Sequence, residues 1–338
     1  MFQTEPILYL QSLGNEWLTI FMILITTLGS SAFLVALILA TTFGIDFKKG
    51  FLLFQLLIWT GLITGAFKIL VAFPRPDFVD NRVLNLEYGT KNISPFRGNW
   101  PDGILSLPNN EILKAFRLQD SIMSSPFGFP SGHVAITTSL WGGAAVLFNN
   151  RLIKFMIPFM IISMAFSRMY LGRHFLGDVI GGAILGLILL GIFILFVKSP
   201  LKEAFFEKEN FKFALRPRNL LFYIFMFVLP VFLTGLNLVG SDTAGFLLGT
   251  NIAYLLIIRK GIPVETENSM HNLIRVFIAL GLFGISTLIL KYIFEPAGVI
   301  NYLQFNLLEF LKTFIPSSTI WISVVICRKF GLYTKIEK

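Results

Sequence analysis

The stretch LGDVIGGAILGLILLGIFILFV, residues 176–197, decides the fold class, because it is a continuous apolar run that holds one charged residue, Asp178. A helix of about 20 apolar residues crosses the hydrocarbon core of a bilayer. The backbone of such a segment must satisfy its own hydrogen bonds, since lipid offers none, and a helix does so. The run therefore predicts a transmembrane helix and places the chain among membrane proteins.

Further apolar runs of this kind lie before and after it. They are residues 19–43, 51–73, 132–148, 154–171, 219–238, 243–258, 273–292 and 308–327. Of the 338 residues, 55% are hydrophobic and 14% are charged, whereas soluble chains are about 25% charged. We predict an all-α, polytopic integral membrane helix bundle with about nine spans.

Basic residues predict the orientation of these spans. Most of the 28 lysines and arginines lie in alternate connections, at 48–49, 151–154, 198–218, 259–275 and 328–338. The positive-inside rule makes this face cytoplasmic and puts the N-terminus outside. The net charge of +9 then belongs to cytoplasmic loops, so we expect no nucleic-acid partner.

Three polar clusters border the apolar runs, and the predicted topology places all of them at the outer face. They read KILVAFPRP (68–76), PSGH (130–133) and SRMYLGRHFLGD (167–178). Charged groups at the edge of a membrane are costly and mark functional sites. The clusters therefore predict one site at the outer interface.

Cations and helix ends in these clusters suit a tetrahedral oxyanion. Lys68, Arg75 and Arg168 form a cationic clamp, and guanidinium groups match phosphate oxygens in geometry. Ser131 and Gly132 stand where a helix begins, so backbone N–H groups and the helix dipole favour an anion there.

Two histidines and an aspartate add catalytic groups. His174 and Asp178 are four residues apart, so the carboxylate can hold one ring nitrogen and leave the other for nucleophilic attack. His133 is available as a general acid. We found no cysteine or carboxylate cluster with metal-ligand spacing, so a metal is not required. We interpret Arg173 as an interface charge.

The three clusters resemble, in order, the motifs Lys-x6-Arg-Pro, Pro-Ser-Gly-His and Ser-Arg-x5-His-x3-Asp of the type 2 phosphatidic acid phosphatase family. This family belongs to the superfamily of membrane lipid phosphatases and vanadium haloperoxidases. The resemblance implies that His174 forms a phosphohistidine, that Asp178 orients it and that His133 protonates the leaving alcohol. It also implies a set of groups that hold the phosphoryl oxygens: Lys68, Arg75, Arg168, Ser131 and the Gly132 amide. The family works without a metal, so we expect no cofactor.

The resemblance covers about residues 20–197 and suggests a division of the chain. Residues 1–197, with the N-terminal five spans, form the predicted membrane phosphatase core. Residues 198–218 form a basic cytoplasmic linker, and residues 219–338 form a C-terminal four-span region of unknown role.

We expect metal-independent hydrolysis of a lipid phosphate monoester or diphosphate, because the site opens where lipid headgroups lie. The expected partners are a phosphorylated lipid substrate and membrane lipids. Three alternatives stay open: a soluble ester such as a sugar phosphate, phosphoryl transfer to another lipid, and a transporter or scaffold that binds phosphate without hydrolysis. The third motif resembles bacterial members, so we expect a bacterial inner membrane and a periplasm-facing site, or an endoplasmic reticulum membrane and a lumenal site if the protein is eukaryotic.

Overall fold

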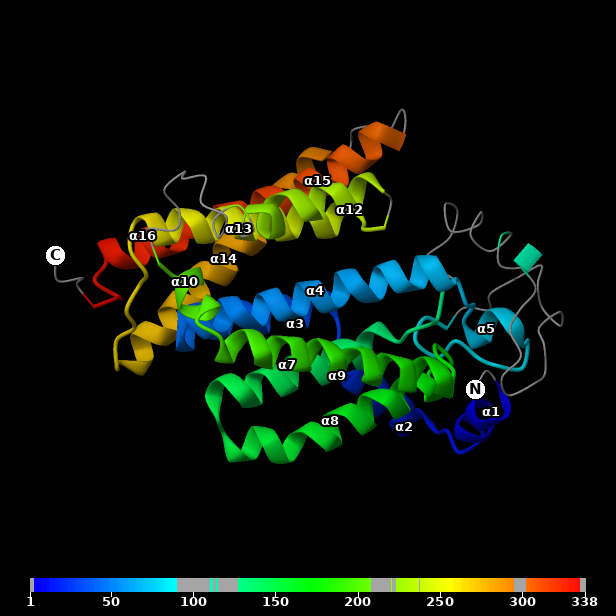
Figure 1. The fold of residues 1–338 in the computed structure, drawn as a ribbon. Coiled ribbons are helices and arrows are strands. Elements are labelled where there is room, and N and C mark those ends of the chain that lie inside the picture. The colour runs from blue at the N-terminus through cyan, green and yellow to red at the C-terminus, as the bar shows by residue number, and fades with distance from the viewer. Residues whose placement is uncertain are drawn as a thin grey trace. The chain divides into compact units, whose positions relative to one another are not determined.

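The structure is a computed structural model of the chain (Figure 1). It describes residues 3–89, 127–207, 223–236, 238–294 and 302–334, together with positions 110, 111, 114 and 220. All the named regular elements in these residues are helices, so the predicted all-α class is confirmed.

The helices follow one another along the chain, and two of them, η1 and η3, are π-helical. They are α1 (Glu5–Ser12), α2 (Glu16–Thr27), α3 (Ser31–Ala40), η1 (Thr41–Ile45), α4 (Phe47–Val71), α5 (Pro76–Val79), α7 (Gly132–Phe148), α8 (Arg151–Tyr170), α9 (Leu176–Lys198), α10 (Leu201–Phe205), η3 (Ile224–Val228), α12 (Leu229–Gly235), α13 (Ser241–Arg259), α14 (Ser269–Phe294), α15 (Tyr302–Thr319) and α16 (Trp321–Lys329).

Six helical segments in the described part of the chain are long and apolar enough to cross a membrane. They are Phe47–Val71, Arg151–Tyr170, Leu176–Lys198, Ser241–Arg259, Ser269–Phe294 and Asn306–Lys329. The pair Glu16–Thr27 and Ser31–Ile45 passes the same test together but bends by 51°. Gly132–Phe148 and Ile224–Gly235 are apolar but shorter. The long helices are consistent with an integral membrane protein, while the count of nine spans stays a prediction.

The chain groups into two compact units. The first consists of Met1–Leu34 and Trp59–Ile194, and the second of Val35–Ile58 and Leu195–Lys338. This grouping assigns residues 35–58 to the same unit as the C-terminal region, whereas the sequence division placed them with the first five spans. The predicted roles of the three parts stay predictions.

In the first unit, α7 and α8 pack against each other across a tight turn. Asn149 ends α7 in the left-handed conformation, with φ of 50°, and Asn150 then caps α8 by accepting hydrogen bonds from the amides of Leu152 and Ile153. The other end of α8 is held by α2, because the Ser167 hydroxyl donates to the carbonyl of Met22 over 2.7 Å. Both ends of α8 are thus fixed, and its C-terminal end carries the third polar cluster.

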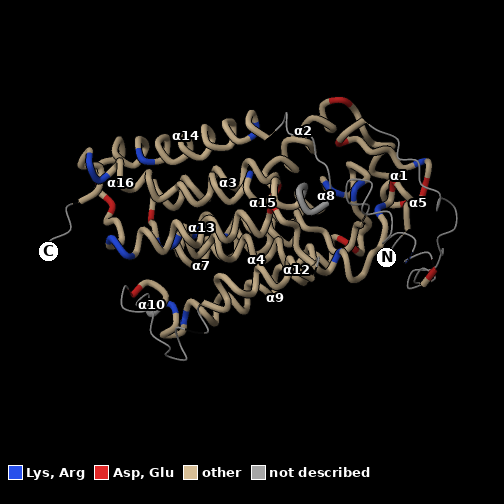
Figure 2. Tube along the Cα trace, turned by 90° about the horizontal axis from the view of Figure 1, so that it is seen from above, with Lys and Arg blue, Asp and Glu red and all other residues tan. Residues whose placement is uncertain are grey.

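The short helix α1 anchors the segment that follows α5. The Gln11 side chain donates to the Leu84 carbonyl over 2.8 Å and accepts from the Leu84 amide over 3.1 Å. Ile7 is fully buried and packs with Val83 and Phe175. Figure 2 shows Lys, Arg, Asp and Glu residues gathered around α1 and α5, next to long stretches of helix without charge.

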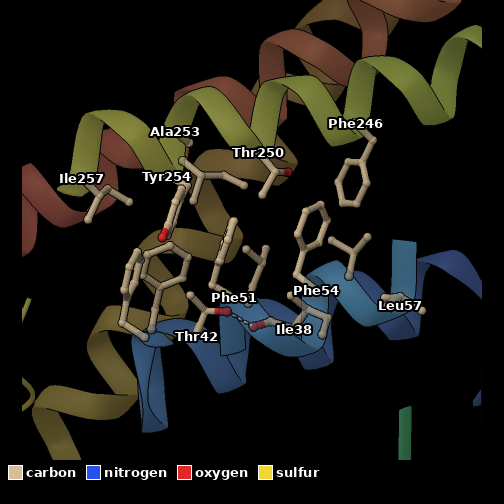
Figure 3. Close-up of a pocket in the computed structure, with 15 residues that line it drawn as sticks. Ile38, Thr42, Phe51, Phe54, Leu57, Phe246, Thr250, Ala253, Tyr254 and Ile257 are labelled. Carbon is tan, nitrogen blue, oxygen red and sulfur yellow. Dashed lines mark hydrogen bonds between the residues drawn. The ribbon is translucent and has the colours of Figure 1, made fainter. Parts of the chain in front are cut away.

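The second unit contains a partly open pocket whose lining is almost entirely apolar. Phe51 and Phe54 of α4 line it together with Phe246 and Tyr254 of α13 (Figure 3). The rings of Phe51 and Tyr254 stack with their centroids 3.7 Å apart. Aromatic side chains therefore supply much of the packing between α4 and α13 within this unit.

Two buried polar groups of the second unit bond to carbonyl oxygens of the π-helices. Asn251 accepts from Gln55 and donates to the carbonyl of Met226 in η3, each over 2.8 Å. The fully buried Arg275 donates through Nε to the carbonyl of Phe43 in η1 over 2.7 Å. A π-helix leaves carbonyls outside the regular helical ladder, and these side chains satisfy two of them.

Candidate active site

The first and second polar clusters meet where α4 ends. Lys68, in the last turn of α4, donates through Nζ to the carbonyls of Phe127 and Gly128 over 3.0 and 3.3 Å. The Gly128 amide donates to the carbonyl of Phe73 over 2.7 Å, and Pro74 pairs with Phe127 in an antiparallel bridge. The chain just before Arg75 is thereby tied to the chain that leads into Pro-Ser-Gly-His.

The second and third clusters meet through the backbone. The Ser131 amide donates to the carbonyl of Asp178 over 2.9 Å, which joins the start of α7 to the first turn of α9. Gly182 permits this contact, because a Cβ atom there would lie 2.5 Å from the Ser131 carbonyl oxygen. Ser131 is fully buried, and its hydroxyl has no hydrogen-bond partner among the described residues.

The third cluster bends back on itself between α8 and α9. Gly172 has φ of 73°, and the Arg173 amide donates to the carbonyl of Arg168 over 3.0 Å. This turn brings His174 to the start of α9, where its Nδ1 lies 3.3 Å from Oδ2 of Asp178. The same carboxylate oxygen accepts from the Phe175 amide over 3.0 Å. The backbone therefore fixes the carboxylate that holds the imidazole.

Arg168 is 2% exposed and reaches from the end of α8 to two neighbours. Its Nη1 donates to the Thr26 hydroxyl over 2.6 Å and to Oε1 of Glu87 over 3.1 Å. Its Nε is buried and has no hydrogen-bond partner in the described part of the chain. One end of the guanidinium is thus held by protein, and its Nε donor stays available.

His133 lies in the first turn of α7, within electrostatic range of Arg168, Arg75 and Lys68. The break between α2 and α3 passes beside its ring, and a Cβ atom on Gly29 would lie 2.5 Å from the imidazole Cδ2. The two histidines also interact with each other electrostatically. Both imidazoles of the predicted site therefore belong to one cluster with its cations.

The cations of this cluster crowd one another. Burial, together with the charges of Arg173 and Arg168, lowers the pKa of Arg75 to about 9. Burial and the charges of Lys68 and Arg168 hold the pKa of His174 well below its usual value, so its imidazole is neutral at pH 7. A bound anion would relieve the repulsion among these cations, and the cluster is therefore suited to hold one.

The eight residues predicted from sequence all lie in the first unit, and hydrogen bonds or electrostatic interactions connect the three clusters to one another. They are Lys68, Arg75, Ser131, Gly132, His133, Arg168, His174 and Asp178. The catalytic and binding roles assigned to them are proposals. Among the described residues, no group of three or more His, Cys, Asp or Glu side chains could hold a metal ion.

Sequence reasoning missed the acidic residues beside this cluster. Arg173, which we read as an interface charge, is only 7% exposed. Its Nη1 lies 3.3 Å from Oδ2 of Asp77, and its Nε lies 3.3 Å from Oε2 of Glu87. Its guanidinium also lies over the ring of Tyr88, 5.2 Å from the centroid. The one available signal was the acidic content of residues 77–87, directly after the first motif.

Comparison with known proteins agrees with these motifs. Residues 49–201, which include all eight predicted site residues, match the PAP2 superfamily. The match supports similarity to a type 2 phosphatidic acid phosphatase-like family, and the predicted resemblance is confirmed. Similarity to this superfamily indicates a phosphatase in general, that is, a phosphoric ester hydrolase. No curated protein and no solved structure matched the chain.

Proposed function

We propose that the protein hydrolyses a lipid phosphate monoester or diphosphate at the outer membrane face, through a phosphohistidine on His174 and without a metal. The observation that carries this proposal is the 3.3 Å approach of His174 Nδ1 to Asp178 Oδ2 inside a cluster of buried and half-buried cations. A site that only binds phosphate needs cations and N–H donors, and it has no use for an oriented neutral imidazole.

In the first step, Asp178 accepts the Nδ1–H of His174, so that Nε2 carries the lone pair. This lone pair forms a bond to phosphorus, and the bond from phosphorus to the leaving oxygen breaks. The leaving oxygen keeps the bonding electrons and takes a proton from His133. The products of the step are the free alcohol, or the shorter phosphate in the case of a diphosphate, and a phosphohistidine at position 174.

In the second step, a water oxygen bonds to the same phosphorus while His133 takes one of the water protons. The phosphorus–nitrogen bond breaks, and its electrons return to Nε2 of His174. Inorganic phosphate leaves, and both histidines regain their initial protonation states. The two steps together consume one water and release one phosphate.

Cationic and N–H donors stabilise the charge on the transferring phosphoryl group. Lys68, Arg75 and Arg168 supply positive charge, and Ser131 and the Gly132 amide supply hydrogen bonds at the start of α7. The buried Ser131 hydroxyl and Arg168 Nε, which lack partners in the described residues, are donors suited to phosphoryl oxygens. This is the arrangement that in-line phosphoryl transfer requires.

Location supports a lipid substrate and an outer site. Lys68 is in the last turn of the long apolar helix α4, and Asp178 is in the first turn of the long apolar helix α9. The cluster thus lies at the ends of two candidate spans, where lipid headgroups lie. The distribution of basic residues supports an outer position for these ends.

Phosphate release by the detergent-purified full chain tests this function. The assay includes a chelator, and the substrates are phosphatidic acid, phosphatidylglycerol phosphate, undecaprenyl diphosphate, sphingosine phosphate and glucose 6-phosphate. We expect release from at least one lipid that survives the chelator and is lost in His174→Ala. Release only from glucose 6-phosphate would contradict the lipid assignment, and no release from any substrate would contradict hydrolysis.

A further inference from the structure

We propose that Glu87 is a positioning residue that orients Arg168, so that the Nε edge of its guanidinium faces the phosphoryl group. This proposal rests on the proposed function, because it concerns the same oxyanion site. Glu87 lies outside the three sequence motifs, in the segment between α5 and the second cluster.

The contacts of Arg168 divide its guanidinium into two parts. Both described side-chain partners, Thr26 and Glu87, bind the same nitrogen, Nη1. The Nε and Nη2 groups form the opposite edge, which carries two parallel N–H bonds and matches two oxygens of a phosphate. Holding Nη1 therefore presents the phosphate-binding edge without occupying it.

Unpartnered donors mark the place where an oxyanion would be held. Nε of Arg168 and the hydroxyl of Ser131 are both buried, and neither has a hydrogen-bond partner in the described residues. Leaving a buried donor unpaired is unfavourable, and more so when the donor is charged. The two donors belong to motifs that the backbone joins, since the amide of Ser131 bonds to the carbonyl of Asp178.

Glu87 is itself held in place, as a positioning residue must be. Its second oxygen, Oε2, forms an ion pair without hydrogen-bond geometry with Nε of Arg173, 3.3 Å away, and Arg173 in turn pairs with the buried Asp77. The amide of Leu86, the preceding residue, donates to the carbonyl of Leu171 over 3.2 Å. Glu87 is thus attached through its backbone neighbour and its carboxylate to the turn that carries the third motif.

Glu87 could instead compete with phosphate for Arg168. This opposite role predicts a different effect of Glu87 substitutions on the binding of an oxyanion. Removing a competing carboxylate would strengthen binding of an oxyanion, because the cluster would become more positive. Removing a positioning carboxylate weakens it, because the guanidinium loses its orientation. The contact of Glu87 with Nη1, rather than with the Nε edge, favours positioning.

The experiment uses the full chain in detergent with four single variants, Glu87→Ala, Glu87→Gln, Glu87→Asp and Arg168→Ala, and with the double variant that combines Glu87→Ala and Arg168→Ala. Asp80→Asn is the matched control, because Asp80 is an acid of the same segment that pairs with Arg82 and Thr4 instead. Binding of orthovanadate, a tetrahedral oxyanion, is measured by calorimetry, and phosphate release is measured with dioctanoyl phosphatidic acid. Thermal unfolding of each variant reports whether it is folded.

We expect Glu87→Ala to lower kcat by about tenfold to a hundredfold, with KM changed less than about threefold, since Lys68 and Arg75 still hold the substrate. In Glu87→Ala, the affinity for orthovanadate falls together with kcat. Glu87→Gln lowers the affinity and kcat by smaller factors. In Glu87→Asp, the affinity and kcat lie between those of Glu87→Ala and the wild type. In an Arg168→Ala background, Glu87→Ala has an effect of less than about twofold, because Glu87 acts through Arg168. Asp80→Asn leaves both readouts unchanged.

Tighter orthovanadate binding by Glu87→Gln would overturn the proposal in favour of competition. If Glu87→Ala lowers kcat by the same factor in the wild type and in Arg168→Ala, the role of Glu87 is merely structural. If the wild type binds orthovanadate but releases no phosphate, hydrolysis is wrong, and the binding series still decides the role of Glu87. If the wild type binds no orthovanadate, both proposals are wrong. If Glu87→Ala does not fold, the Glu87→Gln and Glu87→Asp series supplies the same comparison.

Discussion

The imidazole Nδ1 of His174 lies 3.3 Å from Oδ2 of Asp178, one helical turn further along the chain. Both side chains are buried, at 2% and 0% exposure, so this contact is shielded from water. The carboxylate oxygen also accepts from the Phe175 amide, which fixes its position independently of the histidine. In the proposed mechanism, the pair therefore leaves Nε2 of His174 as the nitrogen that attacks the phosphoryl group.

Asp178→Asn should slow phosphate release on the order of 10³-fold, because an amide can donate to Nδ1 and stabilise the wrong tautomer of His174. The measurement is kcat with dioctanoyl phosphatidic acid, with thermal unfolding as the check on folding. Asp80→Asn is the control, because Asp80 is an acid of the same unit that pairs with Arg82 and Thr4. A variant Asp178→Asn with wild-type kcat would show that the carboxylate does not orient the nucleophile.

Arg168→Lys should lower kcat by about tenfold to a hundredfold even though the charge is retained, because an ammonium group cannot bind Thr26, Glu87 and two phosphoryl oxygens at once. Steady-state kinetics with the same lipid checks this. Full activity in Arg168→Lys would mean that only the charge matters and that the edge of the guanidinium is unimportant.

Gly29→Ala should impair turnover through His133, since the new Cβ atom would lie 2.5 Å from the imidazole Cδ2 and must displace the ring. We expect a loss of about tenfold or more in kcat, less than the roughly 10²–10⁴-fold that general acid–base catalysis contributes, because the ring is displaced and not removed. Gly61→Ala is the control, because a Cβ atom there meets nothing within 4 Å. Equal kcat in the two variants would show that the position of His133 is not critical.

Stability should fall as the pH decreases through about 6.5. Burial and nearby cations hold the pKa of His174 in the folded protein well below 6.5, whereas the unfolded chain takes up this proton near pH 6.5. The unfolded state then binds more protons, so the free energy of unfolding decreases by up to about 1.4 kcal/mol per pH unit for this group. Thermal unfolding of the wild type and His174→Gln is measured from about pH 7.5 to about pH 5, on both sides of the usual His pKa. The unfolding midpoint should decline less steeply with decreasing pH in the variant. Parallel curves would contradict the lowered pKa.

Arg275→Met should destabilise the second unit without changing the chemistry of the first. Arg275 is fully buried and donates to the carbonyls of Phe43 and Leu332 over 2.7 and 2.8 Å, and the substitution leaves these acceptors unpaired. A loss of about 2–4 kcal/mol is expected, read as a lower midpoint of thermal unfolding. Arg259→Met, at an exposed position, is the control. Equal midpoints would show that these hydrogen bonds contribute little.

The sequence predicted the helical class and the residues of the candidate site because both depend on local patterns. Apolar runs of about 20 residues predict helices by length alone. The spacing of His174 and Asp178 predicts a contact within one helical turn, and the structure contains that contact. The predicted topology placed the three motifs at the same membrane face, because alternate connections between spans share a face. We therefore expected the motifs to form one site.

Contacts that depend on long-range packing could not be predicted in this way. Glu87 and Arg168 are 81 residues apart, and no periodicity relates them. Arg173 looked like an interface charge because its partners Asp77 and Glu87 lie in a distant segment. Likewise, no local pattern predicts that Arg275 bonds to the carbonyl of Phe43, 232 residues away.

The most direct test of the central claim is to trap the phosphorylated intermediate. The purified protein is mixed with excess lipid phosphate, quenched in base, in which a phosphohistidine survives, and digested for mass spectrometry. We predict a phosphoryl group on His174 that disappears on acid treatment and is absent from His174→Ala. Phosphate release without any modification of His174, or a phosphoryl group on another residue, would contradict the mechanism.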